Sequence, residues 1–200
     1  MPTLLQIGAG NIGRGYMAQL FLEAGYRIRF ADAVPELVAA LNDAGQYRLR
    51  VLDAYERRAR EFSIGPIDAV LISDAEAFGR AVSAADVLST AVGVPNLARL
   101  APALAAALRA RREANPHPVN LFLCENTLDA ALRLQSAVMA ELAATDALWV
   151  EQNVGFVGTS VARMVPVLSE AERLADPLLV VADAYRPLPY DATALKAAVP

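Results

Sequence analysis

The stretch IGAGNIGRG, at 7–15, constrains the fold of this chain more than any other part of it. An apolar run at 3–8 precedes its glycines, and a run with helical periodicity follows them. The glycines Gly8, Gly10 and Gly13 have the spacing of a strand-to-helix turn that receives a phosphate group. The first permits a tight turn, the second leaves room for the ligand, and the third lets the helix approach the strand. The stretch therefore predicts a strand, a bare turn and a helix N-terminus that faces an anion.

An acidic residue follows at the position that a dinucleotide requires. Asp32 ends the alternating run YRIRFAD, roughly 20 residues beyond the third glycine. A carboxylate at the end of a second strand accepts hydrogen bonds from both ribose hydroxyls, but it repels the 2′-phosphate of NADP. Ala33 adds no compensating charge. We therefore expect NAD as the cofactor, bound by Gly8, Gly10, Asn11, Ile12, Gly13 and Asp32.

Short apolar runs alternate with longer runs of helical period along most of the chain. Alternation of this kind is typical of an α/β fold with a doubly wound, mostly parallel sheet, the Rossmann fold. One proline, Pro102, lies inside an expected helix and should bend it. The expected strands are 3–8, 26–32, 67–73, 85–93, 119–126 and 148–154, and the expected helices are 11–25, 34–45, 74–83, 96–114 and 128–144.

Two segments interrupt this alternation. Residues 46–64 combine alternating apolar side chains with a charged turn, which indicates an inserted strand pair. Residues 155–200 are rich in proline and contain one strand candidate, at 178–185. We expect 1–200 to form a dinucleotide-binding domain, whose irregular part at 155–200 packs on it or leads to a separate domain.

The run STAVGVPNL, at 89–97, ends an expected strand in small residues and then begins a helix. In a doubly wound sheet, such a loop lines the cofactor crevice. This adds four cofactor-binding candidates, although an ordinary glycine turn explains the local sequence equally well. The four candidates are Thr90, Ala91, Val92 and Gly93.

Charge and composition exclude several classes of partner. The net charge of −4 disfavours nucleic acid and anionic membranes, which both attract basic surfaces. The apolar runs are too short and too interrupted to span a bilayer. A single cysteine cannot form an internal disulfide, and a single histidine does not favour a metal site. Together with the lack of a basic leader, the single cysteine leads us to expect a cytoplasmic protein.

Three strings together carry a resemblance to a known family. GAGNIGRGY at 8–16, CEN at 124–126 and NVGFVGTSVARMVP at 153–166 occur in the order found in the N-terminal domain of polyol-specific long-chain dehydrogenases, the mannitol dehydrogenase family. The resemblance implies hydride transfer with NAD, without a metal, between a polyol or polyol phosphate and a ketose. It also implies that Asn126 helps to hold the reacting oxygen, although a strand-end asparagine can equally cap the next helix.

The resemblance places the catalytic base outside this stretch of sequence. Members of the family carry it in a Lys-x4-Asn-x2-His pattern on a helical C-terminal domain, which we expect beyond residue 200. The chain's one lysine, Lys196, cannot complete that pattern. Alone, the chain should bind NAD without catalysing a reaction. The alternatives are a stand-alone module that senses NAD(H), or a uronate-type or hydroxyacyl-type reductase of the same fold.

Two arginines are candidates for contact with the substrate. Arg14 follows the glycine turn and could bind a phosphate or face solvent, and Arg163 could bind the substrate or pair with an acid. The chain has Gly158 and Ala162 where family members usually have aspartates. These replacements leave open which polyol is used and whether it is phosphorylated, and the sequence defines neither reaction direction nor oligomeric state.

Overall fold

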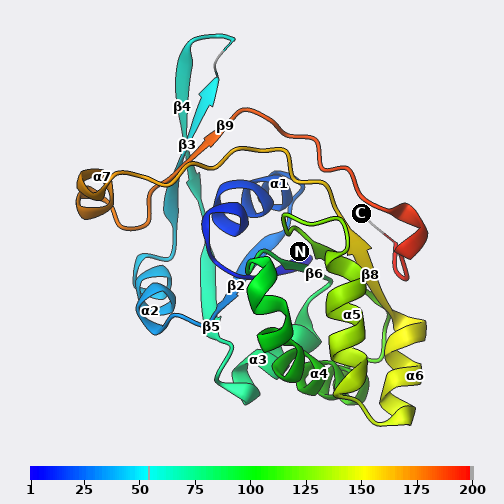
Figure 1. Cartoon of the computed structure of the whole chain (residues 1–200). Helices are drawn as coiled ribbons and strands as arrows, with labels where there is room; N and C mark the ends of the chain where they lie inside the picture. The colour runs from blue at the N-terminus through cyan, green and yellow to red at the C-terminus, as the bar shows by residue number, and fades with distance from the viewer. Residues whose placement is uncertain (54, 199–200) are drawn as a thin grey trace.

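The computed structural model describes residues 1–53 and 55–198, and its centre is a sheet of parallel strands (Figure 1). Their spatial order is β5-β2-β1-β6-β7-β8, the order of a doubly wound dinucleotide-binding fold. The fold class predicted from the sequence is therefore confirmed. The strands are β1 (Thr3–Ile7), β2 (Arg27–Asp32), β5 (Ile67–Leu71), β6 (Val87–Thr90), β7 (Val119–Leu123) and β8 (Val154–Gly158).

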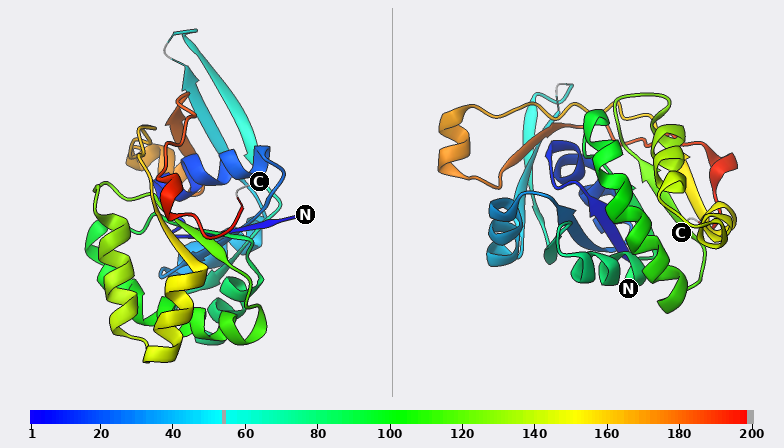
Figure 2. Two further views of the ribbon diagram at one scale, coloured as in Figure 1. Left: turned by 90° about the vertical axis from the view of Figure 1, so that its right-hand side faces the viewer. Right: turned by 60° about the horizontal axis from the view of Figure 1, so that its bottom comes forward.

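Helices cover both faces of this sheet, as the views in Figures 1 and 2 show. Side chains of α3, α4 and α5 form one core with one face, and α1, α2 and a small second sheet form another core with the other face. No helix in the described ranges is long and apolar enough to cross a bilayer. The helices are α1 (Ala18–Glu23), α2 (Pro35–Ala44), α3 (Ala75–Ala84), α4 (Leu97–Ala114), α5 (Ala130–Ala140), α6 (Ala144–Asn153) and α7 (Glu170–Ala175), and Gly13–Met17 forms a π-helical turn before α1.

The central strand β7 shows why the sequence reads as continuous apolar runs. All five of its residues are buried. Leu121 and Leu123 belong to the core beneath α3, α4 and α5, whereas Phe122 belongs to the core on the opposite face. A parallel strand covered on both sides requires apolar side chains at successive positions, which is the pattern that predicted this strand.

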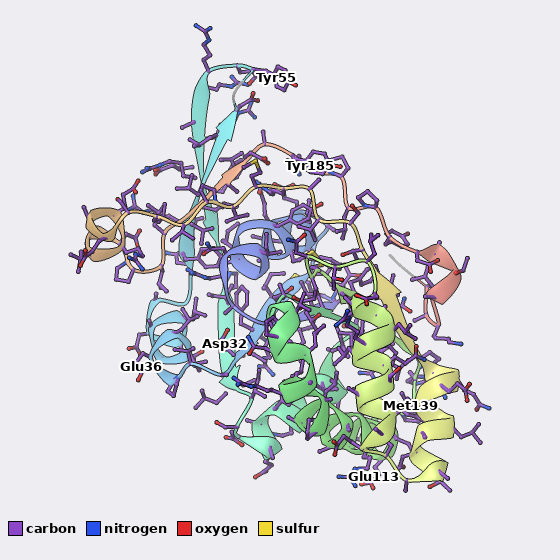
Figure 3. All side chains as sticks on the ribbon, in the orientation of Figure 1. Asp32, Glu36, Tyr55, Glu113, Met139 and Tyr185 are labelled. Atoms are coloured by element: carbon purple, nitrogen blue, oxygen red, sulfur yellow. The ribbon has the colours of Figure 1, made fainter. Side chains whose placement is uncertain are left out.

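The small sheet has the order β4-β3-β9. Strands β3 (Tyr47–Asp53) and β4 (Arg58–Ile64) form the inserted antiparallel pair that the sequence predicts, and the hairpin projects from the body (Figures 1 and 2). Tyr55 lies near its tip (Figure 3). The strand candidate at 178–185 is β9 (Val180–Asp183), which pairs in parallel with β3.

The expected strand at 148–154 is wrong. Helix α6 continues to Asn153, and the strand begins only at Val154, which pairs with Val119 of β7. The run LWV is apolar at consecutive positions, and a short run of that kind suits a buried strand or a helix equally well. Tertiary packing selects the helix: Val150 is buried, and Trp149 packs against the same core.

Three carbonyl groups of the segment 155–198 are bound by side chains of the main body. Leu178 and Pro187 accept hydrogen bonds from the side chains of Arg14 and Tyr16, respectively. Further along, the carbonyl of Ala197 accepts a hydrogen bond from Nδ2 of Asn120. Buried backbone groups need such partners, so side chains of the main body satisfy the main chain of this segment.

Candidate functional site

The glycine turn lies at the carboxyl ends of β1 and β6, where the order of the sheet reverses. Gly8 has a φ of +90°, and a Cβ built on it would lie 2.4 Å from the carbonyl oxygen of Ala91. A Cβ on Gly13 would lie 2.1 Å from the carbonyl oxygen of Gly8. At Gly10 no atom lies within 4 Å of such a Cβ. Protein packing therefore requires two of the glycines, and the third borders open space.

Asp32 connects this turn to the next helix. Its Oδ2 accepts a hydrogen bond from the backbone N–H of Ala9 at 2.7 Å, and its Oδ1 accepts one from Val34 at 2.9 Å. Figure 3 shows the side chain beyond the end of β2, between the ribbons of α2 and α4. Each carboxylate oxygen can accept a further hydrogen bond, so the group retains capacity for a ligand.

The turn and Asp32 line one pocket of about 400 Å³, together with the loop after β6. Five of the predicted cofactor residues line this pocket: Gly8, Gly10, Asp32, Ala91 and Val92.

Sequence reasoning missed several walls of this pocket. Ile72 and Leu100 are apolar, and Arg99 is an exposed cation at the pocket's edge. Ile72 comes directly after β5, whereas Arg99 and Leu100 lie in the first turn of α4. Because the carboxyl ends of parallel strands meet at one edge of a sheet, the position after the strand is the signal that could have identified Ile72.

The other predicted cofactor residues do not line this pocket. Ile12 is half-buried and packs against the core, Asn11 is half-buried, and Gly13 is covered by the turn. Thr90 is fully buried, and its hydroxyl has no hydrogen-bond partner within the described part of the chain. Gly93 has a φ of +87° and donates its N–H to Glu125.

Asn126 borders a second pocket of about 240 Å³, beyond the carboxyl ends of β7 and β8. Glu125, Thr159 and Ser160 line the same pocket. The residue that directly precedes α5 is Asp129, so Asn126 does not occupy the capping position of that helix. Asn126 is exposed and borders this recess.

Arg14 and Arg163 make internal hydrogen bonds. Arg14 donates from Nε to the carbonyl of Ala9 at 2.7 Å, and its Nη1 donates to Leu178. Arg163 donates from Nη1 to Oε1 of Gln19 at 2.9 Å. Burial lowers the pKa of both guanidinium groups. Neither residue lines the two pockets described above, and direct contact with a substrate stays a prediction.

Two further residues, Cys124 and Lys196, do not line either pocket. The Cys124 thiol is buried beside Met17 and Ser89, and burial raises its pKa to about 11. Lys196 donates its backbone N–H to Asn120, near the amino end of β7 and thus at the opposite edge of the sheet from the pockets. Within residues 1–53 and 55–198, no three His, Cys, Asp or Glu side chains gather as ligands for a metal ion.

Several known proteins are similar to this chain in sequence or in fold. Residues 2–200 match a family model described as the mannitol dehydrogenase Rossmann domain. Mannitol-1-phosphate 5-dehydrogenase of Bacillus licheniformis is 32% identical over 197 residues, which are 98% of this chain and 50% of that protein. The chain therefore spans about half the length of this relative.

Two solved structures share the fold at lower identity. Mannitol 2-dehydrogenase of Pseudomonas fluorescens, in a ternary complex with NAD and D-mannitol, has a TM-score of 0.77 and 20% identity over 96% of this chain and 49% of that one. D-sorbitol dehydrogenase in substrate-free form has a TM-score of 0.76 and 18% identity over 94% of this chain and 49% of that one. On the match of residues 2–200, the chain belongs to the mannitol dehydrogenase family.

Proposed function

We propose that residues 1–200 are a dinucleotide-binding domain that binds NAD in the pocket between the glycine turn and the loop after β6. The observation that carries this proposal is that Gly10 and Asp32 line the same pocket. Gly10 leaves open space where a pyrophosphate must approach the backbone. Asp32 offers a carboxylate to the ribose hydroxyls, already oriented by two backbone N–H groups. The residues present therefore fit a dinucleotide.

The substrate that we propose is a polyol phosphate, mannitol 1-phosphate, interconverted with fructose 6-phosphate. The 32% identical relative supports this choice, since it is a mannitol-1-phosphate 5-dehydrogenase. A bound NAD would accept the hydride that leaves the alcohol carbon. The amide of Asn126 would donate a hydrogen bond to the reacting oxygen and stabilise its developing negative charge.

The alcohol proton also needs an acceptor. The chain's one lysine sits at the far edge of the sheet. We therefore propose that the base comes from a helical domain outside residues 1–200, and that this domain completes the recess around Asn126.

The first test measures cofactor binding by the 200-residue chain. Titration calorimetry should detect NAD binding, with NADP weaker by at least about tenfold, because the 2′-phosphate would be placed against the Asp32 carboxylate. AMP serves as a control, since it carries the adenosine ribose without the second nucleotide. Equal affinity for NAD and NADP, or no binding of either, would contradict the proposal.

The second test adds a C-terminal half taken from a relative. Fused to the C-terminal half of the Bacillus licheniformis relative, the chain should form NADH from mannitol 1-phosphate, whereas the unfused chain should not, because it lacks a positioned base. Asn126→Ala in the fusion should lower kcat by roughly 10²–10³-fold, the range for loss of one oxyanion donor. The same assay with mannitol and with sorbitol, which carry no phosphate, shows whether the fusion requires a phosphorylated polyol. Turnover by the unfused chain would refute the assignment of the base.

A further inference from the structure

Glu125 makes two contacts that the proposed function leaves unexplained. It is 5% exposed and lies two positions after the end of β7. Its Oε1 accepts a hydrogen bond from the backbone N–H of Val92, and its Oε2 accepts one from Gly93, both at 2.8 Å. One carboxylate thus holds two consecutive amides of a loop that belongs to a different strand.

The other hydrogen bonds to these two residues are local, because the side-chain amide and the backbone N–H of Asn96 donate to the carbonyls of Val92 and Gly93, respectively. Strand β6 ends at Thr90, so Val92 and Gly93 lie beyond its ladder of hydrogen bonds. Gly93 also has a φ of +87°, a conformation that L side chains rarely adopt. The carboxylate therefore fixes a turn that the sheet alone does not define.

A buried carboxylate is a costly way to hold a loop. No ion pair within the described ranges includes Glu125, and burying an unpaired charge is unfavourable. Each of its two oxygens instead accepts a hydrogen bond from one backbone N–H. The two hydrogen bonds fix the position of the backbone at Val92 and Gly93.

The loop that Glu125 holds is a wall of the cofactor pocket. Val92 lines that pocket, and the carbonyl of the adjacent Ala91 lies against Gly8 at the turn. Glu125 itself lines the second pocket beside Asn126. The same side chain therefore connects the cofactor wall to the recess where the reacting oxygen would bind.

We propose that Glu125 is a positioning residue that fixes the loop 91–93 for dinucleotide binding. The inference rests on the proposed function, because it takes NAD as the occupant of the pocket. The loss of one of the two contacts of Glu125 should let the loop move and weaken NAD binding, while the fold is retained.

The test is Glu125→Gln, which keeps the size of the side chain but has one carbonyl oxygen and an NH₂ group that faces a backbone N–H. NAD affinity should fall about tenfold in calorimetry at a temperature well below the unfolding midpoint. The matched control is Asp183→Asn, because the Asp183 carboxylate also accepts from two backbone N–H groups, those of Met164 and Tyr185, outside both pockets. The control should leave NAD affinity unchanged, and the unfolding midpoint of each variant shows how much stability it has lost.

The outcomes separate the two proposals. If the unmutated chain does not bind NAD, the proposed function fails; if it binds and Glu125→Gln binds equally well, the role of Glu125 fails. Amide hydrogen exchange on the unmutated chain provides a measurement that does not depend on the folding of a variant. The N–H groups of Val92 and Gly93 should exchange at least about tenfold more slowly than that of Leu128, an exposed loop residue, and equal rates would overturn the proposal.

Discussion

Gly13→Ala is expected to destabilise the chain by about 3 kcal/mol, the upper end of the usual cost of overpacking. A Cβ at this position would lie 2.1 Å from the carbonyl oxygen of Gly8 and 3.1 Å from the side chain of Gln6. The nearer neighbour is backbone and cannot rotate away. Relief requires the helix to move off β1, which opens the core around Tyr16 and Met17. Urea unfolding followed by circular dichroism measures the loss.

Gly10→Ala is the matched control, since the same methyl group on the same turn meets no atom within 4 Å. Its free energy of unfolding should stay within about 1 kcal/mol of the parent. In the proposed complex, however, the methyl group would lie where the pyrophosphate approaches, so NAD affinity should fall. If both variants lost the same stability, or if Gly10→Ala bound NAD like the parent, the assignment of separate roles to the two glycines would be wrong.

Asp32→Ala is expected to weaken NAD binding by roughly 100-fold, or about 2.7 kcal/mol. The carboxylate would make charge-assisted hydrogen bonds to the ribose, which contribute about 1.5–3 kcal/mol each. The substitution also releases the N–H of Ala9 and so loosens the glycine turn. The preference for NAD over NADP should shrink at the same time, because the repulsion of the 2′-phosphate disappears. Calorimetry with both cofactors measures the two effects together.

Asp74→Ala provides the comparison for this second prediction. Asp74 also follows a strand and holds the start of a helix, through a hydrogen bond from the N–H of Ala77 at 2.9 Å. It does not line the cofactor pocket. Its replacement should reduce stability by about 1 kcal/mol, the usual value of such a cap, and leave NAD affinity unchanged. An unchanged affinity in Asp32→Ala would remove the main support for the nucleotide pocket.

Patterns in neighbouring residues predicted several elements of the fold correctly. The glycine turn, the alternation in β2 and the inserted hairpin each follow from the periodicity of neighbouring residues. The same reasoning failed at 148–153, where consecutive apolar residues suit either a strand or a helix. There, contact between Val150 and a core built by distant elements selects the helix.

The pocket beside the glycine turn could be predicted in part, because Gly8, Gly10 and Asp32 all lie in one contiguous stretch and belong to one known sequence pattern. The rest depended on contacts between residues far apart in the sequence. Pairing of β9 with β3, the internal hydrogen bonds of Arg14 and Arg163, and the two contacts of Glu125 all join distant segments.

Patterns in neighbouring residues thus predicted most strands of the sheet, the turn and the acid that make this chain a candidate nucleotide binder. Only the tertiary structure decided which buried polar groups hold the pocket walls. The physical reason is that a buried donor or acceptor must find a partner, and its identity depends on which segments folding brings together.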